Sequence, residues 1–186
     1  FTKLIESHKL IQKNPLTENF KSSYGFIIKF TDKTAYKLME HDLKPIYELF
    51  LDIRDPRCNY FQFNPLVIEP LNTNSPRHNS IEFHYDNHAT WYSWLVEKKI
   101  YLPLFVSVIY VSLPEKFIGG NLVLKKFDRK KRYKKVRPSI GMHVNFRGDL
   151  FHGVEAIQSD EHVKRISLVF EQYSIPNFNP DAFTIN

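Results

Sequence analysis

The chain has 186 residues, of which 42% are hydrophobic and 25% charged, and this is enough apolar material to bury one sizeable core. Eleven Pro, six Gly and no low-complexity tract argue against a collagen-like or disordered chain, and no apolar run approaches the roughly 18 residues that a membrane span needs. The counts exclude fibre, disorder and a membrane span, and they favour a single domain over residues 1–186.

The positive charge is confined to one segment. The formal net charge is +6, yet Lys125–Arg137 alone holds nine basic residues and one acid, and the rest of the chain has 17 basic and 19 acidic residues. A basic stripe on one segment is a weaker sign of nucleic-acid binding than a basic protein is. The segment is therefore either a solvated hairpin or a docking surface for an acidic partner.

Cysteine usage bears on the compartment. Cys58 is the only cysteine, which excludes an intrachain disulfide and a cysteine-based zinc cluster. A reducing compartment is compatible with this, so we expect a cytoplasmic protein. The chain begins at Phe1 rather than at Met, and we expect a trimmed N-terminus in which a targeting peptide would be invisible.

Residues 1–58 contain the helical signal and are expected to form a helical support. Asp32 is predicted to cap a segment in which apolar residues recur at three- and four-residue spacing, namely Tyr36, Met39, Leu43, Ile46, Phe50 and Ile53. Pro45 interrupts this pattern and is predicted to divide the segment into two short helices.

From residue 59 to 175 the pattern changes to short β-rich runs about ten residues apart. Seven runs stand out, at residues 60–70, 80–86, 102–114, 121–127, 141–146, 151–157 and 165–173. Turn residues separate them at Gly119–Gly120, Pro138–Gly141 and Gly148–Asp149. The pattern predicts a mainly β core, a sandwich, jelly roll or barrel, with supporting α-helices and a C-terminal tail at 176–186.

Candidate metal ligands lie in two of these runs. Residues i and i+2 of a strand project from the same face, so His84 and Asp86 offer an imidazole nitrogen and a carboxylate to one point. His152, just beyond the predicted turn at Gly148–Asp149, is the best third ligand. His88 and His143 are nearby alternatives, the first only if its segment is helical and the second as a core or rim residue.

A candidate anion site follows in the last run. Arg165 and Ser167 share one face of an otherwise apolar strand, and a guanidinium directed into a β core needs an anion. Its fork suits a carboxylate held by two hydrogen bonds, to which the Ser167 hydroxyl could also donate. The alternative is a structural ion pair with a buried acid such as Glu171.

The motifs occur in the order His84-x-Asp86, Gly119–Leu122, Pro138-x-x-Gly141, Phe151–Val154 and Arg165-x-Ser167. This combination resembles the Fe(II)/2-oxoglutarate-dependent oxygenases, especially their prolyl-4-hydroxylase-like branch, over residues 60–173. The resemblance implies a double-stranded β-helix, a cupin-like jelly roll with helices along one side. It also implies roles for the residues: iron ligands His84, Asp86 and His152, and 2-oxoglutarate contacts Arg165, Ser167 and either Tyr110 or, if the register differs by one, Val111.

The resemblance further implies an activity. It is the hydroxylation of an unactivated C–H bond in a peptidyl, amino-acid or natural-product substrate, with O2 consumed and succinate and CO2 released. Ascorbate is a possible reductant. Halogenating relatives replace the carboxylate ligand with a small residue, so Asp86 favours hydroxylation over halogenation. Two neutral imidazoles and one carboxylate also leave adjacent metal positions open, as such chemistry requires.

Two other functions remain open. Oxidative demethylation of nucleic acid is one, although that branch has a second arginine six residues after the first, and here Glu171 occupies the position and would repel phosphate. A metal-binding cupin-like module without turnover is the other. Four residues beside the expected mouth of the β core are candidates for substrate contact, namely Asn87, Trp91, Trp94 and Arg147. For the two Trp residues, ordinary packing against the helices is the alternative.

Overall fold

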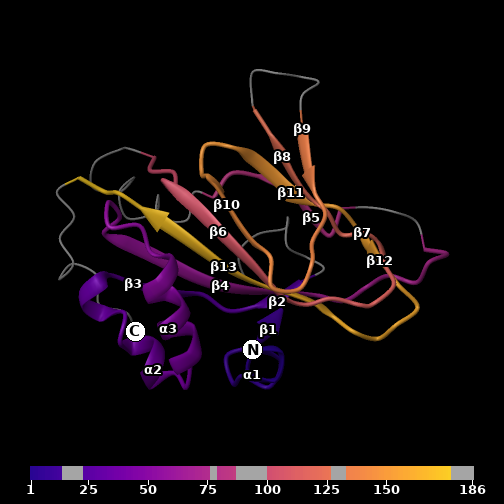
Figure 1. Cartoon of the computed structure of the whole chain (residues 1–186), viewed down its shortest axis with the longest axis horizontal. Helices are drawn as coiled ribbons and strands as arrows, with labels where there is room; N and C mark the ends of the chain where they lie inside the picture. The colour runs from indigo at the N-terminus through magenta and orange to yellow at the C-terminus, as the bar shows by residue number, and fades with distance from the viewer. Residues whose placement is uncertain (14–22, 76–78, 87–99, 127–132, 177–186) are drawn as a thin grey trace.

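The computed structural model describes residues 1–13, 23–75, 79–86, 100–126 and 133–176, and the described part is mainly β (Figure 1). The larger sheet has the strand order β1 (Gln12–Lys13), β2 (Ser23–Gly25), β4 (Tyr60–Ile68), β13 (Arg165–Tyr173), β6 (Phe105–Ser112) and β10 (His143–Arg147), and β3 (Ile28–Phe30) also pairs with β4. A second sheet has the order β5 (Ile81–His84), β11 (Phe151–Val154), β8 (Leu122–Lys125) and β9 (Tyr133–Val136). The strands of both sheets pair antiparallel, and β7 (Ile118–Gly119) pairs with β12 (Ile157–Gln158) in the same way.

The central strand β13 has two faces with different partners. Ile166, Leu168 and Phe170 pack with the helices in the main apolar cluster. Their neighbours at odd positions project to the opposite face, because side chains alternate along a strand. On that side lie Ile81, Val154 and Leu122 of the second sheet. The molecule is thus a cupin-like sandwich with helices along one side, which confirms the predicted fold class (Figure 1).

The predicted division of the helical segment is confirmed, but the predicted cap is wrong. A single 3-10 turn, Asp32–Thr34, precedes α2 (Lys37–Glu40) and α3 (Lys44–Ile53), and Pro45 lies in the first turn of α3. Thr31 is the capping residue, since its backbone N–H donates to Thr34 Oγ1 at 2.8 Å. The Asp32 carboxylate instead accepts a hydrogen bond from Arg54 Nη1 at 2.5 Å.

The apolar stripe of this segment is buried only in part. Leu43, Ile46 and Phe50 lie in the core, whereas Tyr36 and Met39 are 46% and 42% exposed. The regular spacing does not run on through the break between the helices, because each short helix sets its own buried face. In α2, the residue that packs into the main core is instead Leu38, next to Met39 in the sequence.

The first 58 residues also contain strands that the sequence did not predict. β1, β2 and β3 extend the larger sheet beyond β4, and α1 (Thr2–Glu6) precedes them. By contrast, each of the seven predicted β runs overlaps a strand, in order β4, β5, β6, β8, β10, β11 and β13. Among the described residues, no helix is long and apolar enough to cross a membrane.

Candidate metal centre

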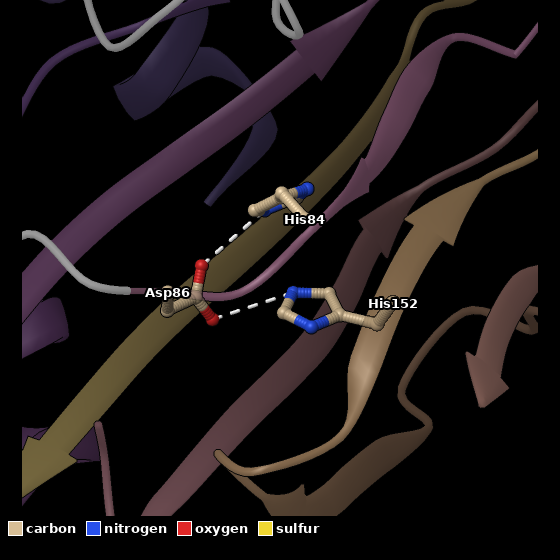
Figure 2. A group of neighbouring side chains, drawn as sticks. All are labelled: His84, Asp86 and His152. Atoms are coloured by element: carbon tan, nitrogen blue, oxygen red, sulfur yellow. Dashed lines mark ion pairs between the residues drawn. The ribbon is translucent and has the colours of Figure 1, made fainter. Parts of the chain in front are cut away.

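The three predicted metal ligands come together where β5 and β11 pair. His84 is the last residue of β5 and lies directly opposite His152 of β11, and Asp86 follows two residues after His84. Figure 2 shows the Asp86 carboxylate beside the two imidazole rings, with one oxygen directed to each histidine. Gly153 makes this approach possible, because a Cβ there would lie 2.9 Å from the Ile81 carbonyl oxygen of β5.

The geometry of the group suits a metal ion. One ligand atom from each of His84, Asp86 and His152 lies within 4.8 Å of the other two. The Nε2 atoms of both histidines are 3.3 Å from the Asp86 carboxylate oxygens. Metal–ligand bonds of ~2.1 Å place neighbouring ligand atoms of one ion about 3 Å apart. Two imidazoles and one carboxylate therefore stand close to the arrangement that a divalent transition metal needs, and they occupy one side of it.

Backbone carbonyls orient both imidazoles. The Nδ1 atom of His84 is 2.8 Å from the carbonyl oxygen of Glu82, and that of His152 is 3.0 Å from the carbonyl oxygen of Leu150. A carbonyl oxygen only accepts, so each Nδ1 must donate its proton. The Nε2 lone pairs are then directed to the metal position, as second-shell partners of metal-binding histidines commonly ensure.

The charges of the group are strongly coupled. Burial disfavours the ionised Asp86 carboxylate, but the two imidazoles, His152 foremost, outweigh burial and hold the pKa of Asp86 below its ordinary value. Burial disfavours protonated His152 as well, and here Asp86 and, to a smaller extent, Glu171 raise the pKa of His152. The lowered pKa keeps the Asp86 carboxylate ionised at neutral pH, which a metal ligand requires.

Arg165 lies in the same cavity as the metal ligands. Its side chain is 1% exposed, and with Ser167 it lines a pocket that His84, Asp86 and His152 also line. The guanidinium lies 5.0 Å from the centre of the Tyr110 ring, and Nη1 donates to Ser167 Oγ at 3.3 Å. Arg165 Nε and the Tyr110 hydroxyl have no hydrogen-bond partner in the described part of the chain. Burial lowers the pKa of Arg165, so an anion here would relieve an existing cost.

The structure decides between the two residues considered beside Arg165. Tyr110 lies opposite Ser167 in the β6–β13 pairing and is fully buried. Val111 points to the other face of the sheet, where it packs against the helix-side cluster. Tyr110 is therefore the one of the two that lies beside Arg165 and Ser167.

The structural ion pair that was the alternative for Arg165 is not formed among the described residues. Glu171 instead accepts hydrogen bonds from Gln62 Nε2, at 2.8 Å, and from the Tyr173 hydroxyl. Glu171 lies six positions after Arg165 along the same strand. The cavity is therefore lined by both a buried guanidinium, that of Arg165, and a buried carboxylate, that of Glu171, and the two do not pair with each other.

Sequence reasoning missed the polar residues that surround Glu171. Gln62 and Asn64 project from β4 on the cavity side and are buried, and Tyr173 follows Glu171 at i+2 on β13. Their signal was present, because polar residues at alternate positions of two long β runs indicate a polar face. Only the pairing of Gln62 with Glu171 in the structure shows that the two polar faces meet.

Other predicted residues have different outcomes. His143 is exposed on β10 and belongs to no metal-binding group of the described residues. Arg147, at the end of the same strand, forms an exposed ion pair with Asp149. The predicted substrate residues Asn87, Trp91 and Trp94, and the alternative ligand His88, lie outside the described residues.

The basic segment is described at its two ends, with residues 127–132 outside the description. Lys125 and Tyr133 face each other where β8 and β9 pair, so the ends form an antiparallel ribbon. Lys135 makes an ion pair with Glu155, and the Lys125 ammonium lies 3.6 Å from the centre of the Phe83 ring. The acidic partner stays a prediction.

No family model and no curated protein matches the chain. Among solved structures, a bsmA homolog from Methylobium petroleophilum aligns over 97% of this chain and 83% of its own, with 12% identity and a TM-score of 0.50. A 2OG-Fe(II) oxygenase family oxidoreductase from Burkholderia pseudomallei aligns over 82% and 67% (15% identity, TM-score 0.45). A Pseudomonas putida prolyl-4-hydroxylase aligns over 88% and 76% (15% identity, TM-score 0.45). At 12% identity, the similarity to the bsmA homolog concerns the fold alone.

Proposed function

We propose that the protein is an Fe(II)- and 2-oxoglutarate-dependent dioxygenase that hydroxylates an unactivated C–H bond and releases succinate and CO2. One observation carries the proposal: His84, Asp86 and His152 share a cavity with a buried arginine that has no carboxylate partner among the described residues. A metal site alone would suit a binding module. A metal site beside a preformed carboxylate receptor suits a reaction that consumes a 2-oxo diacid.

The residues present fit both groups. His84, Asp86 and His152 would hold the iron, which when bound supplies the one-electron and O2 chemistry that amino-acid side chains lack. Arg165 would bind the distal carboxylate of 2-oxoglutarate through two parallel N–H donors, and the hydroxyls of Ser167 and Tyr110 would donate to the same group. The apolar walls around them, Val108 and Val169 among others, exclude water from the reacting centre.

The substrate belongs to the same proposal. We keep a peptidyl, amino-acid or natural-product substrate and the prolyl-4-hydroxylase-like branch, with O2 as co-reactant and ascorbate as auxiliary reductant. Asp86 supports hydroxylation, since a carboxylate at this ligand position leaves no room for halide. Nucleic-acid demethylation is disfavoured because Glu171, which lines the cavity, would repel a phosphate.

The decisive experiment measures succinate formed from 2-oxoglutarate in air, with Fe(II) and ascorbate. Slow turnover without a primary substrate is expected, and it should disappear in His152→Ala together with stoichiometric Fe(II) binding. The matched control is His143→Ala, an exposed histidine on β10, which should leave both unchanged. If the iron-loaded protein forms no succinate with any substrate mixture tried, the dioxygenase proposal is wrong and the protein is a metal-binding module without turnover. Iron binding that survives His152→Ala would reject the ligand set.

A further inference from the structure

The cavity has a negative region as well as a positive one. Glu171 lines it together with Arg165, and its side chain is 2% exposed. The two residues are six positions apart on the same face of β13, which separates their backbones by about 20 Å at ~3.3 Å per residue. A five-carbon diacid bound to Arg165 is much shorter than this separation. The proposed cosubstrate therefore leaves the Glu171 region for another molecule.

The Glu171 carboxylate is fixed in place by neutral groups. Gln62 Nε2 donates to Oε1 at 2.8 Å, and the Tyr173 hydroxyl donates to Oε2. Neither donor brings a positive charge. Both residues are themselves fully buried, so the carboxylate cannot swing out to water without breaking these bonds.

The carboxylate also lines the same cavity as the three predicted metal ligands. Glu171 and His152 line the same cavity, so a molecule bound at Glu171 would lie beside the metal position.

The walls next to Glu171 are apolar. Val106 of β6 lies directly opposite Glu171 in the strand pairing, and Val108 and Val169 form the next pair along the same face. All three line the cavity. An alkyl chain fits such walls, and a charged group at its end would meet the carboxylate. A lining of valines that leads to one fixed acid is thus complementary to an aliphatic chain with a cationic head.

We propose that Glu171 binds the cationic group of the primary substrate, an alkyl amine or alkyl guanidine whose chain lies between the valines beside the metal position. This deepens the proposed function and rests on it for the identity of the reaction. The two buried charges then direct the two ligands to different ends of the cavity. The dicarboxylate is attracted to Arg165 and repelled by Glu171, whereas the cationic substrate is attracted to Glu171 and repelled by Arg165.

The test uses matched pairs of small probes. N-acetyl-L-arginine amide is compared with N-acetyl-L-citrulline amide, and N-acetyl-L-lysine amide with N-acetyl-L-norleucine amide. Binding is measured by calorimetry on protein loaded with Zn(II) and 2-oxoglutarate, in which no turnover occurs. At least one cationic probe should bind tenfold or more tightly than its neutral partner. Equal binding within both pairs would overturn the proposal, and this arm needs no variant.

Glu171→Gln supplies the second arm. It removes the charge and keeps the side-chain size, and it should reduce the cation preference at least tenfold, while Glu171→Asp should retain part of it. The control Glu48→Gln removes the same charge from the exposed face of α3 and should change nothing. A preference that persists in Glu171→Gln would overturn the proposal, and thermal unfolding shows whether each variant is folded.

The same titrations separate this proposal from the proposed function. Zn(II) and 2-oxoglutarate binding without any cation preference would refute the role of Glu171 and leave the oxygenase standing. A cation preference that depends on Glu171, measured on metal-free protein that binds no 2-oxoglutarate, would retain the acidic site and refute the oxygenase.

Discussion

Replacing Arg165 by Met should separate cosubstrate binding from folding. The guanidinium is 1% exposed, and within the described part of the chain its hydrogen bonding is limited to the 3.3 Å contact with Ser167 Oγ, with Nε unpaired. A carboxylate bound by two charge-assisted hydrogen bonds at about 1.5 kcal/mol each gains about 3 kcal/mol. At 1.4 kcal/mol per factor of ten, its loss should raise the Kd for 2-oxoglutarate about 100-fold.

The effect on stability should have the opposite sign. Burial lowers the pKa of Arg165, so the folded state disfavours the charged group that the unfolded chain tolerates. Met removes that cost and fills a similar volume, and the ligand-free variant should gain about 1 kcal/mol or more, a Tm increase of about 2–4 °C. Wild-type protein should instead be stabilised by about 2.7 kcal/mol when 2-oxoglutarate is present at 100 times its Kd.

Calorimetry of 2-oxoglutarate on the Zn(II)-loaded protein and thermal unfolding with and without the ligand would measure both effects. Arg54→Met, at an exposed arginine that pairs with Asp32, is the control for the loss of one positive charge. An unchanged Kd would refute the carboxylate receptor. A large loss of stability in the ligand-free variant would show that Arg165 is a structural residue.

Three further outcomes are expected. Tyr110→Phe removes a buried hydroxyl that has no partner among the described residues. It should weaken 2-oxoglutarate binding severalfold, which corresponds to about 1 kcal/mol, and leave metal binding intact, as measured by calorimetry. Gly119→Ala should destabilise the fold by about 2 kcal/mol or more, measured by urea unfolding, because φ is +74° and the new Cβ would lie 2.1 Å from the Ala156 carbonyl oxygen. Burial, helped by the charge of Asp55, raises the pKa of Cys58 to about 11, so a thiol reagent at pH 8 should label native protein far more slowly than urea-unfolded protein; equal rates would contradict a buried thiol.

The grouping of the three candidate metal ligands could be predicted from sequence because their geometry is local. His84 and Asp86 are two residues apart at the end of one strand, and His152 follows a recognisable turn. Arg165 stood out for a similar reason, as a charge within an apolar strand. These signals depend on period-two alternation, which a strand imposes wherever it folds.

Features that depend on how the strands pair were harder to predict from the sequence. A register irregularity between Ile166 and Ser167 determines which residue of β6 lies opposite Ser167, and the sequence left Tyr110 and Val111 both open. The contact of Gln62 with Glu171 joins residues 109 positions apart. The strands β1, β2 and β3 have only two or three residues each, too few for any periodic pattern to show.

The alternation along β13 has a consequence for how the protein can vary. Its even-numbered side chains complete the helix-side core, and its odd-numbered ones include Arg165, Ser167 and Glu171. Inserting or deleting one residue within the strand would turn the side chains on one side of the change to the opposite face, placing a charged residue in the core and apolar residues in the cavity. Molecules with that error would fail to fold, so they would not accumulate as folded but inactive protein. Errors of this kind that alter the cavity are therefore eliminated at the folding step.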